Sequence, residues 1–437
     1  MIGTTIKKAF YYLKKNGIKN TIYASCEQLS GVSRMQYRYV EISEKEAAIQ
    51  SQFSFPREIL FSILVPMYET NEAYAKAMIQ SVLGQTYSNF ELILADASSS
   101  DKVKKTVDSF ADERIKYFRI AENKGISVNT NEALKRARGD YIALLDHDDL
   151  LTRDALFYMA KAIYEGMEQD ITYAYLYSDE DKCDSEAVTF YDPNIKPDFN
   201  LDLLLSNNYI CHFLVMKAEL IKELSFRQEF DGAQDYDLVL RAYAKKDTKQ
   251  EIGHVDRVLY HWRCHEASTA ANPQSKLYAY EAGKNAVQDF LNHMKIEAFV
   301  EHTKHNGFYR VQYGKDGLSK QETAEAVFEK RSDVGVLAGN VYKGNKIVSG
   351  ILDANGICIY KGLNRHFSGY LHRAHMQQDC EAADIRNLAV REKLRPILNE
   401  MLQSEKPTDE ESRIKFSMLF CEEVRKRGYR ILWDPFF

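Results

Sequence analysis

Residues 143–149, Ala-Leu-Leu-Asp-His-Asp-Asp, decide the fold, because an apolar run ends there abruptly in carboxylates and an imidazole. The pattern predicts a buried strand whose carboxyl end opens into a polar site. In open α/β sheets, ligands bind at that edge. Asp146 and Asp148, spaced as Asp-X-Asp, are typical ligands of a hard divalent cation, Mg²⁺ or Mn²⁺, that holds a phosphate. A solvated acidic turn explains the run equally well, since Asp also favours turns and helix N-caps.

The stretch before these carboxylates alternates between strand-like and helix-like segments. We predict strands at 61–65, 90–95, 115–120 and 141–145, and helices at 73–83, 103–110 and 129–137. This βαβαβ order predicts a doubly wound, parallel α/β sheet with right-handed crossovers. Neither a GxGxxG after the first strand nor a GxxxxGKS occurs in the sequence, which argues against a dinucleotide-binding fingerprint or a P-loop.

The length and composition of the chain exclude several classes of protein. A chain of 437 residues with a net charge of -5 is too long for one core and too acidic for a general nucleic-acid binder. No apolar run approaches the ~20 residues that span a bilayer, and no signal-peptide pattern opens the sequence. The seven cysteines are scattered without a CxxC pair. We therefore expect a cytoplasmic protein of two or three domains with reduced thiols.

Residues 1–58 are predicted to form a helical extension. Five lysines precede its first acid, Glu27, and apolar residues recur among them at helical spacing: Ile2, Ile6, Phe10 and Leu13. Such a basic amphipathic helix suits a peripheral contact of residues 1–25 with an anionic membrane surface. A helix packed on the next domain, with its lysines in water, fits the same pattern.

Five motifs follow one another in a fixed order within residues 59–270. They are residues 65–68 with 81–87 and 90–96, residues 123–125 with 137–142, residues 146–148, residues 232–241 and residues 260–269. Together they resemble family 2 glycosyltransferases, of the kind that builds bacterial surface polysaccharides. The resemblance implies a GT-A-type doubly wound mixed sheet with a nucleotide-binding half and an acceptor half.

The same resemblance implies a metal site on the acidic run. Asp148 is expected to bind the Mn²⁺ or Mg²⁺ cofactor, and Asp146 to reach the ribose, or the metal through water. A neutral imidazole can complete such a site. His265 is the first choice for this ligand and His261 the runner-up, although either fits a structural role as well. Asp149 is expected to cap the helix that follows.

The acceptor hydroxyl needs a general base, and a carboxylate within hydrogen-bond reach can serve. The resemblance gives this role to Asp235, which follows Gln234 where the family usually has Glu. If a helix continues from Asp235, Asp237 points about 200° away from it. The alternative role of Asp235 is that of a helix N-cap.

By the same resemblance, substrate contacts belong to the strand ends and the helix starts. The expected nucleotide-sugar contacts are Pro66, Tyr68, Glu69, Asp96, Ser98, Asn131 and Asp146. The family's DDGS is altered here to Asp-Ala-Ser-Ser, so a carboxylate is lost at Ala97. The expected acceptor side comprises Asp179, Gly232, Gln234 and Trp262, with a solvated turn as the alternative for Asp179.

Residues 331–437 resemble the second half of another such domain, through residues 334–337, 350–352, 369–370 and 427–435. The first half of that domain has no counterpart there, and the stretch corresponding to the base motif, residues 420–423, carries no Asp. We expect a catalytic domain at 59–300, a connecting segment at 301–330, and a degenerate α/β lobe at 331–437 that binds acceptor or mediates self-association.

These motifs predict an inverting, metal-dependent hexosyltransferase. Its donor would be a UDP- or dTDP-sugar and its acceptor a lipid-linked or polymeric glycan, with no nucleic-acid partner. Inversion is expected because one base drives a single displacement at the anomeric carbon. The alternative is a catalytically silent sugar-nucleotide-binding or scaffold subunit, for which Ala97 and Gln234 leave room. A nucleotidyltransferase would need a Gly-rich, basic phosphate loop, and residues 66–70 do not provide one.

Overall fold

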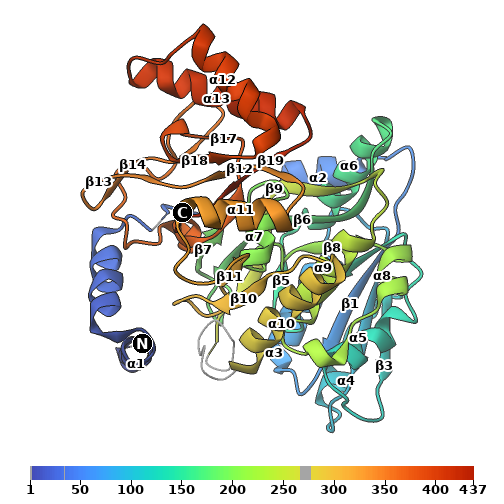
Figure 1. The fold of residues 1–437 in the computed structure, drawn as a ribbon. Coiled ribbons are helices and arrows are strands. Elements are labelled where there is room, and N and C mark those ends of the chain that lie inside the picture. Colours follow the sequence, from blue (N-terminus) through green and yellow to red (C-terminus); the bar gives the residue numbers. More distant parts are fainter. Residues whose placement is uncertain (1, 34, 266–276) are drawn as a thin grey trace. The chain divides into compact units, whose positions relative to one another are not determined.

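The computed structural model describes residues 2–33, 35–265 and 277–437, with the backbone alone for residues 2–9 (Figure 1). The chain divides into two compact units. The larger unit contains residues 36–199 and 208–290, and the smaller unit contains residues 1–35, 200–207 and 291–437. The polypeptide therefore leaves the larger unit and returns to it before entering the smaller unit for good.

A mixed sheet forms the centre of the larger unit, with the strand order β3-β2-β1-β4-β8-β6-β9-β5. The first four of these strands are parallel, β8 is antiparallel to both of its neighbours, and β6 and β9 are parallel. This confirms the predicted fold class. The strands are β1 (Phe61–Met67), β2 (Phe90–Asp96), β3 (Ile115–Arg119), β4 (Tyr141–Leu144), β5 (Leu150–Leu151), β6 (Thr172–Cys183), β7 (Phe190–Asn194), β8 (Leu214–Lys217) and β9 (Gln250–Arg263).

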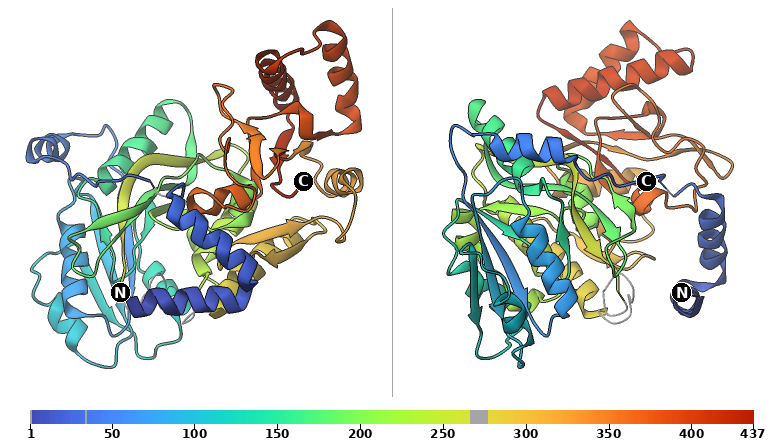
Figure 2. Two further views of the ribbon diagram at one scale, coloured as in Figure 1. Left: turned by 90° about the vertical axis from the view of Figure 1, so that its left-hand side faces the viewer. Right: turned by 180° about the vertical axis from the view of Figure 1, so that it is seen from behind.

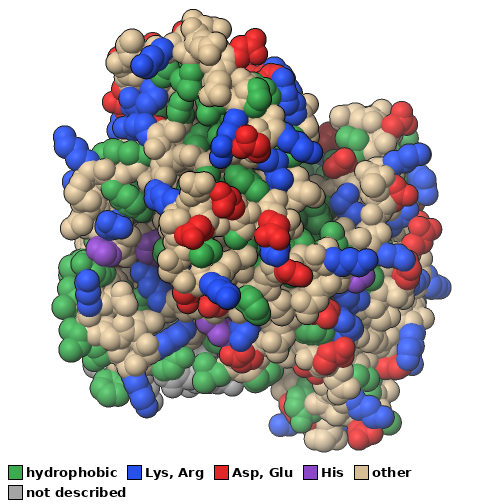
Figure 3. Space-filling model, in the orientation of Figure 1, with side chains coloured by type: hydrophobic (Ala, Val, Ile, Leu, Met, Phe, Trp, Pro, Cys, Tyr) green, Lys and Arg blue, Asp and Glu red, His purple; other side chains and the backbone are tan. Residues whose placement is uncertain are grey.

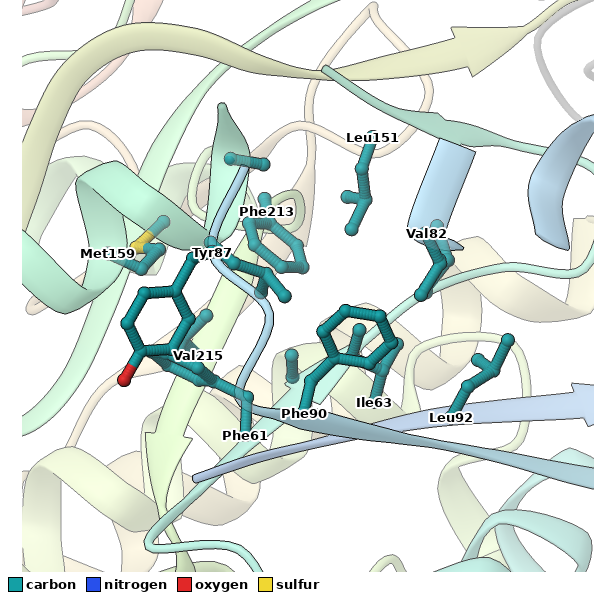
Figure 4. Close-up of a cluster of buried hydrophobic side chains, with 14 of the residues drawn as sticks. Phe61, Ile63, Val82, Tyr87, Phe90, Leu92, Leu151, Met159, Phe213 and Val215 are labelled. Carbon is teal, nitrogen blue, oxygen red and sulfur yellow. The ribbon is translucent and has the colours of Figure 1, made fainter. Parts of the chain in front are cut away.

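Helices cover both faces of this sheet, which explains why β1 and β2 are buried almost throughout. Side chains of β1 alternate: Phe61 and Ile63 enter a core shared with α3 and α6, while α5 packs on β1 and β2 from the other face (Figure 4). The helices of this unit are α2 (Glu44–Gln52), α3 (Glu72–Leu83), α4 (Lys102–Val107), α5 (Ile126–Leu134), α6 (Ala155–Glu168), α8 (Ala218–Leu224), α9 (Gln234–Lys245) and the first part of α10 (Leu277–His293).

A buried polar clamp fixes the start of β4 beside β1 and β2. The Glu91 carboxylate accepts hydrogen bonds from Ser62 Oγ (2.7 Å) and from the Arg138 backbone (2.7 Å) and guanidinium (3.0 Å). Burial raises the pKa of Glu91, but these donors outweigh it and hold the pKa below its usual value. A Cβ at Gly139 would lie 2.6 Å from the backbone nitrogen of Ser62, so this close approach requires glycine.

The smaller unit is built around a second, shorter sheet with the order β16-β19-β12-β18. Helix α13 packs on β19, and α11 packs on β12. Its elements are α1 (Ile2–Ser30), α7 (Leu201–Ser206), β10 (Phe299–His302), β11 (Tyr309–Gln312), α11 (Lys320–Lys330), β12 (Val334–Ala338), β13 (Val341–Lys343), β14 (Lys346–Ser349), β15 (Ile351–Leu352), β16 (Gln378–Asp379), β17 (Ala382–Ala383), β18 (Leu388–Val390), α12 (Arg395–Ser404), α13 (Glu410–Lys426) and β19 (Arg430–Trp433). Among the described helices of the chain, none has both the length and the apolar character needed to cross a membrane.

The two sheets share one pattern of strand directions. In the larger unit β6 lies between antiparallel β8 and parallel β9, and α9 precedes β9. In the smaller unit β12 lies between antiparallel β18 and parallel β19, and α13 precedes β19. This recurrence supports the prediction that residues 331–437 are related to half of a transferase domain, which stays a prediction.

A buried ion pair explains why residues 200–207 belong to the smaller unit. The Arg331 guanidinium donates to both carboxylate oxygens of Asp202 in α7, at 2.7 and 3.0 Å. Both side chains are almost completely buried, at 2% and 3% exposed. Burial raises the pKa of Asp202, but Arg331 outweighs it and holds the pKa well below its usual value. The side chain of Asn200, just before α7, exchanges two hydrogen bonds with the backbone of Asp379.

We expect Asp202→Ala to lower the free energy of unfolding by about 2–4 kcal/mol, because the buried Arg331 guanidinium would lose its buried partner and keep only the more exposed Asp333 as a carboxylate partner. Chemical denaturation followed by circular dichroism measures the loss. The matched control is Glu422→Ala, which removes an exposed ion pair with Lys426 in the same unit and should cost less than about 1 kcal/mol.

The effect of Asp202 should depend on pH. Its pKa is lower in the folded chain than in the unfolded chain, so its contribution is complete above the unfolded pKa near ~4 and is lost as the pH falls below it. The difference between Asp202→Asn and the unsubstituted protein should therefore shrink between pH 7 and pH 3. A difference that stays constant over this range would contradict the ion-pair account.

Candidate active site

The predicted carboxylates gather at the carboxyl edge of the parallel strands. β1 and β2 end side by side, with Met67 opposite Asp96, and β4 ends at Leu144, opposite Leu64. Asp146–Asp149, called the acidic turn from here on, follow β4 closely and lie at the same edge. This is the edge at which open α/β sheets bind ligands.

Asp149 anchors this turn to the distant strand β9. Its carboxylate is 1% exposed and accepts hydrogen bonds from Tyr260 Oη (2.6 Å) and the backbone N–H of Arg263 (2.7 Å). Burial and the neighbouring carboxylates raise the pKa of Asp149 well above its usual value. The expectation that Asp149 caps the next helix is therefore wrong: α6 begins at Ala155, after Asp154 at its N-cap position.

Asp148 and His265 meet, whereas His261 lies elsewhere. His265 Nε2 lies 2.8 Å from Asp148 Oδ2. Burial would raise the pKa of Asp148, but nearby His147 and the contact with His265 keep it below its usual value. His261 Nδ1 instead lies 2.5 Å from Asp181 Oδ1, in a buried position. His265 thus contacts Asp148 and His261 does not, while the role of His265 as a metal ligand stays a prediction; residues 266–269 of the same motif lie outside the described residues.

His212, which the sequence analysis did not single out, lies opposite Asp146. The antiparallel register pairs Ala143 with Val215, and continuing it along the two segments places His212 against Asp146. Asp146, Asp149 and His212 each offer a ligand atom within 4.8 Å of the others. His212 lies within residues 211–216, a strand-like stretch of the sequence, but the direction of that strand in the sheet could not be read from the sequence.

His212 partly compensates the negative charge of the neighbouring carboxylates, Asp146 and Asp149. Burial opposes its charged form, but contacts with Cys211 and Glu180 raise the pKa of His212 well above its usual value. Glu180 Oε2 lies 2.9 Å from His212 Nδ1. Burial raises the pKa of Glu180, yet Lys196 and His212 hold it at about 2. Asp146 keeps an exposed edge, while the protein around it and nearby Asp148 and Asp235 raise its pKa.

Asp235 occupies the first turn of α9, close enough for its charge to act on Asp146. Its Oδ2 accepts hydrogen bonds from Asn208 Nδ2 (2.8 Å) and Cys211 Sγ (3.0 Å). Burial and the charge of Asp235 raise the pKa of the Cys211 thiol to about 12, which keeps it a donor. Neither partner could be recognised from the sequence, because both precede β8 and belong to none of the five motifs.

Asp237 has a different role, as its helical spacing predicts. It is 1% exposed and pairs with Arg227 and with Arg241, whose guanidinium donates to it at 2.7 and 2.9 Å. Arg227 also bonds to Asp289 on α10 (2.7 Å). Asp237 therefore fixes α9, and Asp235 alone of the two faces the acidic turn.

The residues around Asp235 shape the turn that precedes it. Gly232 has a φ of +94°, and a Cβ there would meet the Tyr278 ring at 2.7 Å. Its N–H donates to Gln234 Oε1 (2.8 Å). Gln234 thus closes a local turn, and its contact with an acceptor remains a prediction.

The expected nucleotide contacts form two groups. Asp96 is fully buried; its carboxylate accepts from Tyr117 Oη (2.8 Å) and from the backbone N–H of Ser98 (2.9 Å). Ser98 Oγ accepts from the Glu69 backbone (2.8 Å), so the loops after β1 and β2 are joined. By contrast, Tyr68 is exposed and Pro66 half-buried at the sheet edge.

Three other predicted residues are engaged within the protein. Asn131 exchanges two hydrogen bonds with the Phe226 backbone (2.8 and 2.9 Å) and so holds the segment before α9 against α5. Asp179 is 1% exposed and contacts the Lys196 backbone (2.8 Å) and His254 (3.0 Å). Trp262 lies beside His212, with ring centroids 5.8 Å apart. Their substrate contacts remain predictions.

The donor set fits a divalent cation in two ways. One set is Asp148 with His265, and the other is Asp146, Asp149 and His212. Carboxylates suit Mg²⁺ and Mn²⁺, and an added imidazole favours Mn²⁺. In the second set Glu180 orients His212 from behind, as carboxylates commonly do for metal-binding histidines.

Residues 62–225 match the family model described as Glycosyl transferase family 2. This part of the chain, which includes the acidic turn and His212, belongs to that family. Relatives include the O-antigen biosynthesis protein RfbC of Myxococcus xanthus, 32% identical over 278 residues, which are 63% of this chain and 21% of that protein. Another is the uncharacterized protein y4gI of Sinorhizobium fredii, 42% identical over 236 residues, which are 53% of this chain and 25% of that protein.

The chain spans a quarter or less of the length of these two relatives. Among solved structures, S. aureus TarS in complex with UDP-GlcNAc aligns with a TM-score of 0.43 at 18% identity, over 54% of this chain and 67% of that chain. Family membership thus rests on the sequence match and the ordered motifs.

The affinity for Mn²⁺ distinguishes the two candidate histidines, His265 and His261. We expect His265→Ala to weaken Mn²⁺ binding by about tenfold or more, because an imidazole ligand is lost. His261→Ala is the control and should leave the affinity unchanged, since His261 contacts Asp181. Electron paramagnetic resonance of free Mn²⁺ in a titration measures both. If His212→Gln lost affinity while His265→Ala kept it, the cation would belong to the set of Asp146, Asp149 and His212 instead.

Proposed function

We propose that this protein is an inverting, metal-dependent glycosyltransferase that moves a hexose from a UDP- or dTDP-sugar to a glycan acceptor. One observation carries the proposal: the fold brings Asp235 to the same sheet edge as Asp146 and Asp148. A nucleotide-anchoring acidic turn and a base for the acceptor are the two parts that direct displacement requires.

The base role of Asp235 is supported by its surroundings. Asn208 and Cys211 both donate to Oδ2, which fixes the carboxylate plane. Asp237 and its arginine partners hold the helix that carries it. A carboxylate in this fixed position would accept the proton of an acceptor hydroxyl as that oxygen attacks the anomeric carbon. Because one base serves one displacement, the configuration would invert.

The departing nucleoside diphosphate would need compensation for its negative charge. Mn²⁺ or Mg²⁺, held by Asp148 with His265 or by the neighbouring set, would supply Lewis-acid stabilisation of that leaving group. His212, whose Nδ1 lies 2.9 Å from Glu180 Oε2, would be positioned beside Asp146 by that contact. Glu69, joined to Ser99 by hydrogen bonds of 2.7 and 2.8 Å, would shape the nucleotide side of the edge.

The acceptor is proposed from the names of the relatives. The name of the Myxococcus relative, an O-antigen biosynthesis protein, favours a lipid-linked or polymeric glycan of a surface polysaccharide. Such acceptors are extended at the cytoplasmic face of a membrane, and we place the enzyme there. The smaller unit would contribute acceptor binding or self-association.

A silent sugar-nucleotide-binding subunit is the second candidate, favoured by the lost carboxylate at Ala97 and by Gln234. The two candidates differ in turnover. An enzyme releases UDP or dTDP from its donor in the presence of Mn²⁺, whereas a silent subunit binds donor and releases nothing with any acceptor.

We expect Asp235→Asn to lower the rate of sugar transfer by about 10²–10⁴-fold, because the amide cannot accept the proton. Donor binding, measured by isothermal titration calorimetry, should persist. Asp256→Asn is the matched control: Asp256 is exposed on β9 in the same unit and should tolerate the change. Unchanged transfer by Asp235→Asn would contradict the assigned base, and loss of both binding and transfer would indicate a structural role.

A further inference from the structure

Helix α1 has a face that the rest of the described chain leaves uncovered. The helix is interrupted at Gly17, where φ is 76° and ψ is 171°. Figure 2 shows its two halves meeting at an angle at that point. Each half therefore presents its own face, and residues 18–30 form the second half.

The inner face of the second half is fixed to the smaller unit. Glu27 is 7% exposed, and its carboxylate accepts from the backbone N–H groups of Ser368 (3.0 Å) and Gly369 (2.7 Å). The ring of Tyr23 stacks on His366, with centroids 4.0 Å apart. In the first half, Asn16 donates to the Lys304 carbonyl (3.1 Å). The orientation of α1 about its own axis is thus determined.

The outer face carries large apolar side chains in water. At 100° per residue, Ile18, Ile22 and Leu29 lie within about 40° of one another, and Glu27 lies about 180° from Ile18. These three side chains are 72%, 56% and 88% exposed, and Phe10 in the first half is 69% exposed. The usual amphipathic arrangement is therefore reversed: the acid points inward and the apolar stripe outward. Exposed apolar stripes of this kind mark interaction sites.

The positive charge of the lysines on α1 indicates which kind of partner suits this apolar face. Lys14, Lys15 and Lys19 are exposed on α1, and Glu27, the first acid of the chain, is buried. Figure 3 shows hydrophobic and basic side chains together along the lower left, where Figure 1 draws α1. A second copy of this chain would bring like charges together across the stripe, whereas an anionic lipid surface complements them.

We propose that α1 docks in the plane of an anionic lipid bilayer. Phe10, Ile18, Ile22 and Leu29 enter the boundary between headgroups and acyl chains, and Lys14 and Lys19 lie at the lipid phosphates. Lysine side chains can extend past apolar neighbours to reach such a surface. The contact is independent of the transfer chemistry, since it involves none of the active-site residues.

Co-sedimentation of the full chain with vesicles tests this proposal without donor or acceptor. Vesicles of phosphatidylcholine with phosphatidylglycerol should bind the protein, vesicles of phosphatidylcholine alone should bind it weakly, and added salt should reduce binding. The double variant Ile18→Asp/Ile22→Asp should lose binding by about tenfold or more, because apolar insertion and charge attraction both fail. Val188→Asp is the matched control, since Val188 is 77% exposed in the larger unit.

A second double variant keeps the test valid if Ile18→Asp/Ile22→Asp does not fold. Lys14→Glu/Lys19→Glu keeps the apolar stripe and should weaken binding to the anionic vesicles, with less dependence on salt. Failure of the unsubstituted protein to bind anionic vesicles would overturn the proposal. So would equal binding by all variants, or a dimer in analytical ultracentrifugation that Ile18→Asp/Ile22→Asp abolishes while vesicle binding is unchanged.

Discussion

The buried carboxylate of Asp149 is the constraint on which the site depends. It receives Tyr260 Oη and the Arg263 backbone, so it ties the turn after β4 to β9, more than a hundred residues further along the chain. The Tyr260 hydroxyl also accepts from the Asp146 backbone (3.3 Å). Asp146 and Asp148 on one side of Asp149, and His265 just beyond Arg263, owe their positions to this junction. A carboxyl removed from water in this way must be hydrogen-bonded or neutralised, and here it is crowded by further acids. The same crowding would favour the cation that we propose for this turn.

The motifs that carry the family resemblance divide into structural and chemical parts. Arg138 and Gly139 serve the clamp on Glu91 and Ser62, which sets the register of β4 against β1. Gln85 does similar work at the end of α3: its amide donates to the Thr152 carbonyl (2.7 Å) and accepts from the Leu156 backbone (2.9 Å). These residues position the acidic turn through hydrogen bonds within the protein.

The local sequence pattern was enough to predict the strands and helices around the site and the carboxylates at the ends of the strands. The buried strands β1, β2 and β4 appear where continuous apolar runs predicted them, because central parallel strands are covered on both faces. The two-residue spacing of Asp235 and Asp237 also predicted correctly that they diverge on a helix. Helix α5 begins three residues earlier than predicted, directly after Gly125, where φ is +98° and a Cβ would meet Asp231 at 2.3 Å. That contact joins residues a hundred positions apart and leaves no trace in local sequence.

The sequence by itself determined the alternation of strands and helices up to the acidic turn, the carboxylates at the strand ends and the run of lysines that precedes the first acid, Glu27. Periodicity and the ends of apolar runs encode these features locally. Only the tertiary structure decided which groups face those carboxylates. His212 meets Asp146 because β8 runs antiparallel to β4, and Asn208 and Cys211 meet Asp235 because the chain re-enters the larger unit at residue 208. Likewise, only packing turned Glu27 inward and left Ile18 and Ile22 outside. Pairings between distant segments depend on the register and direction of whole strands and helices, which local composition does not specify.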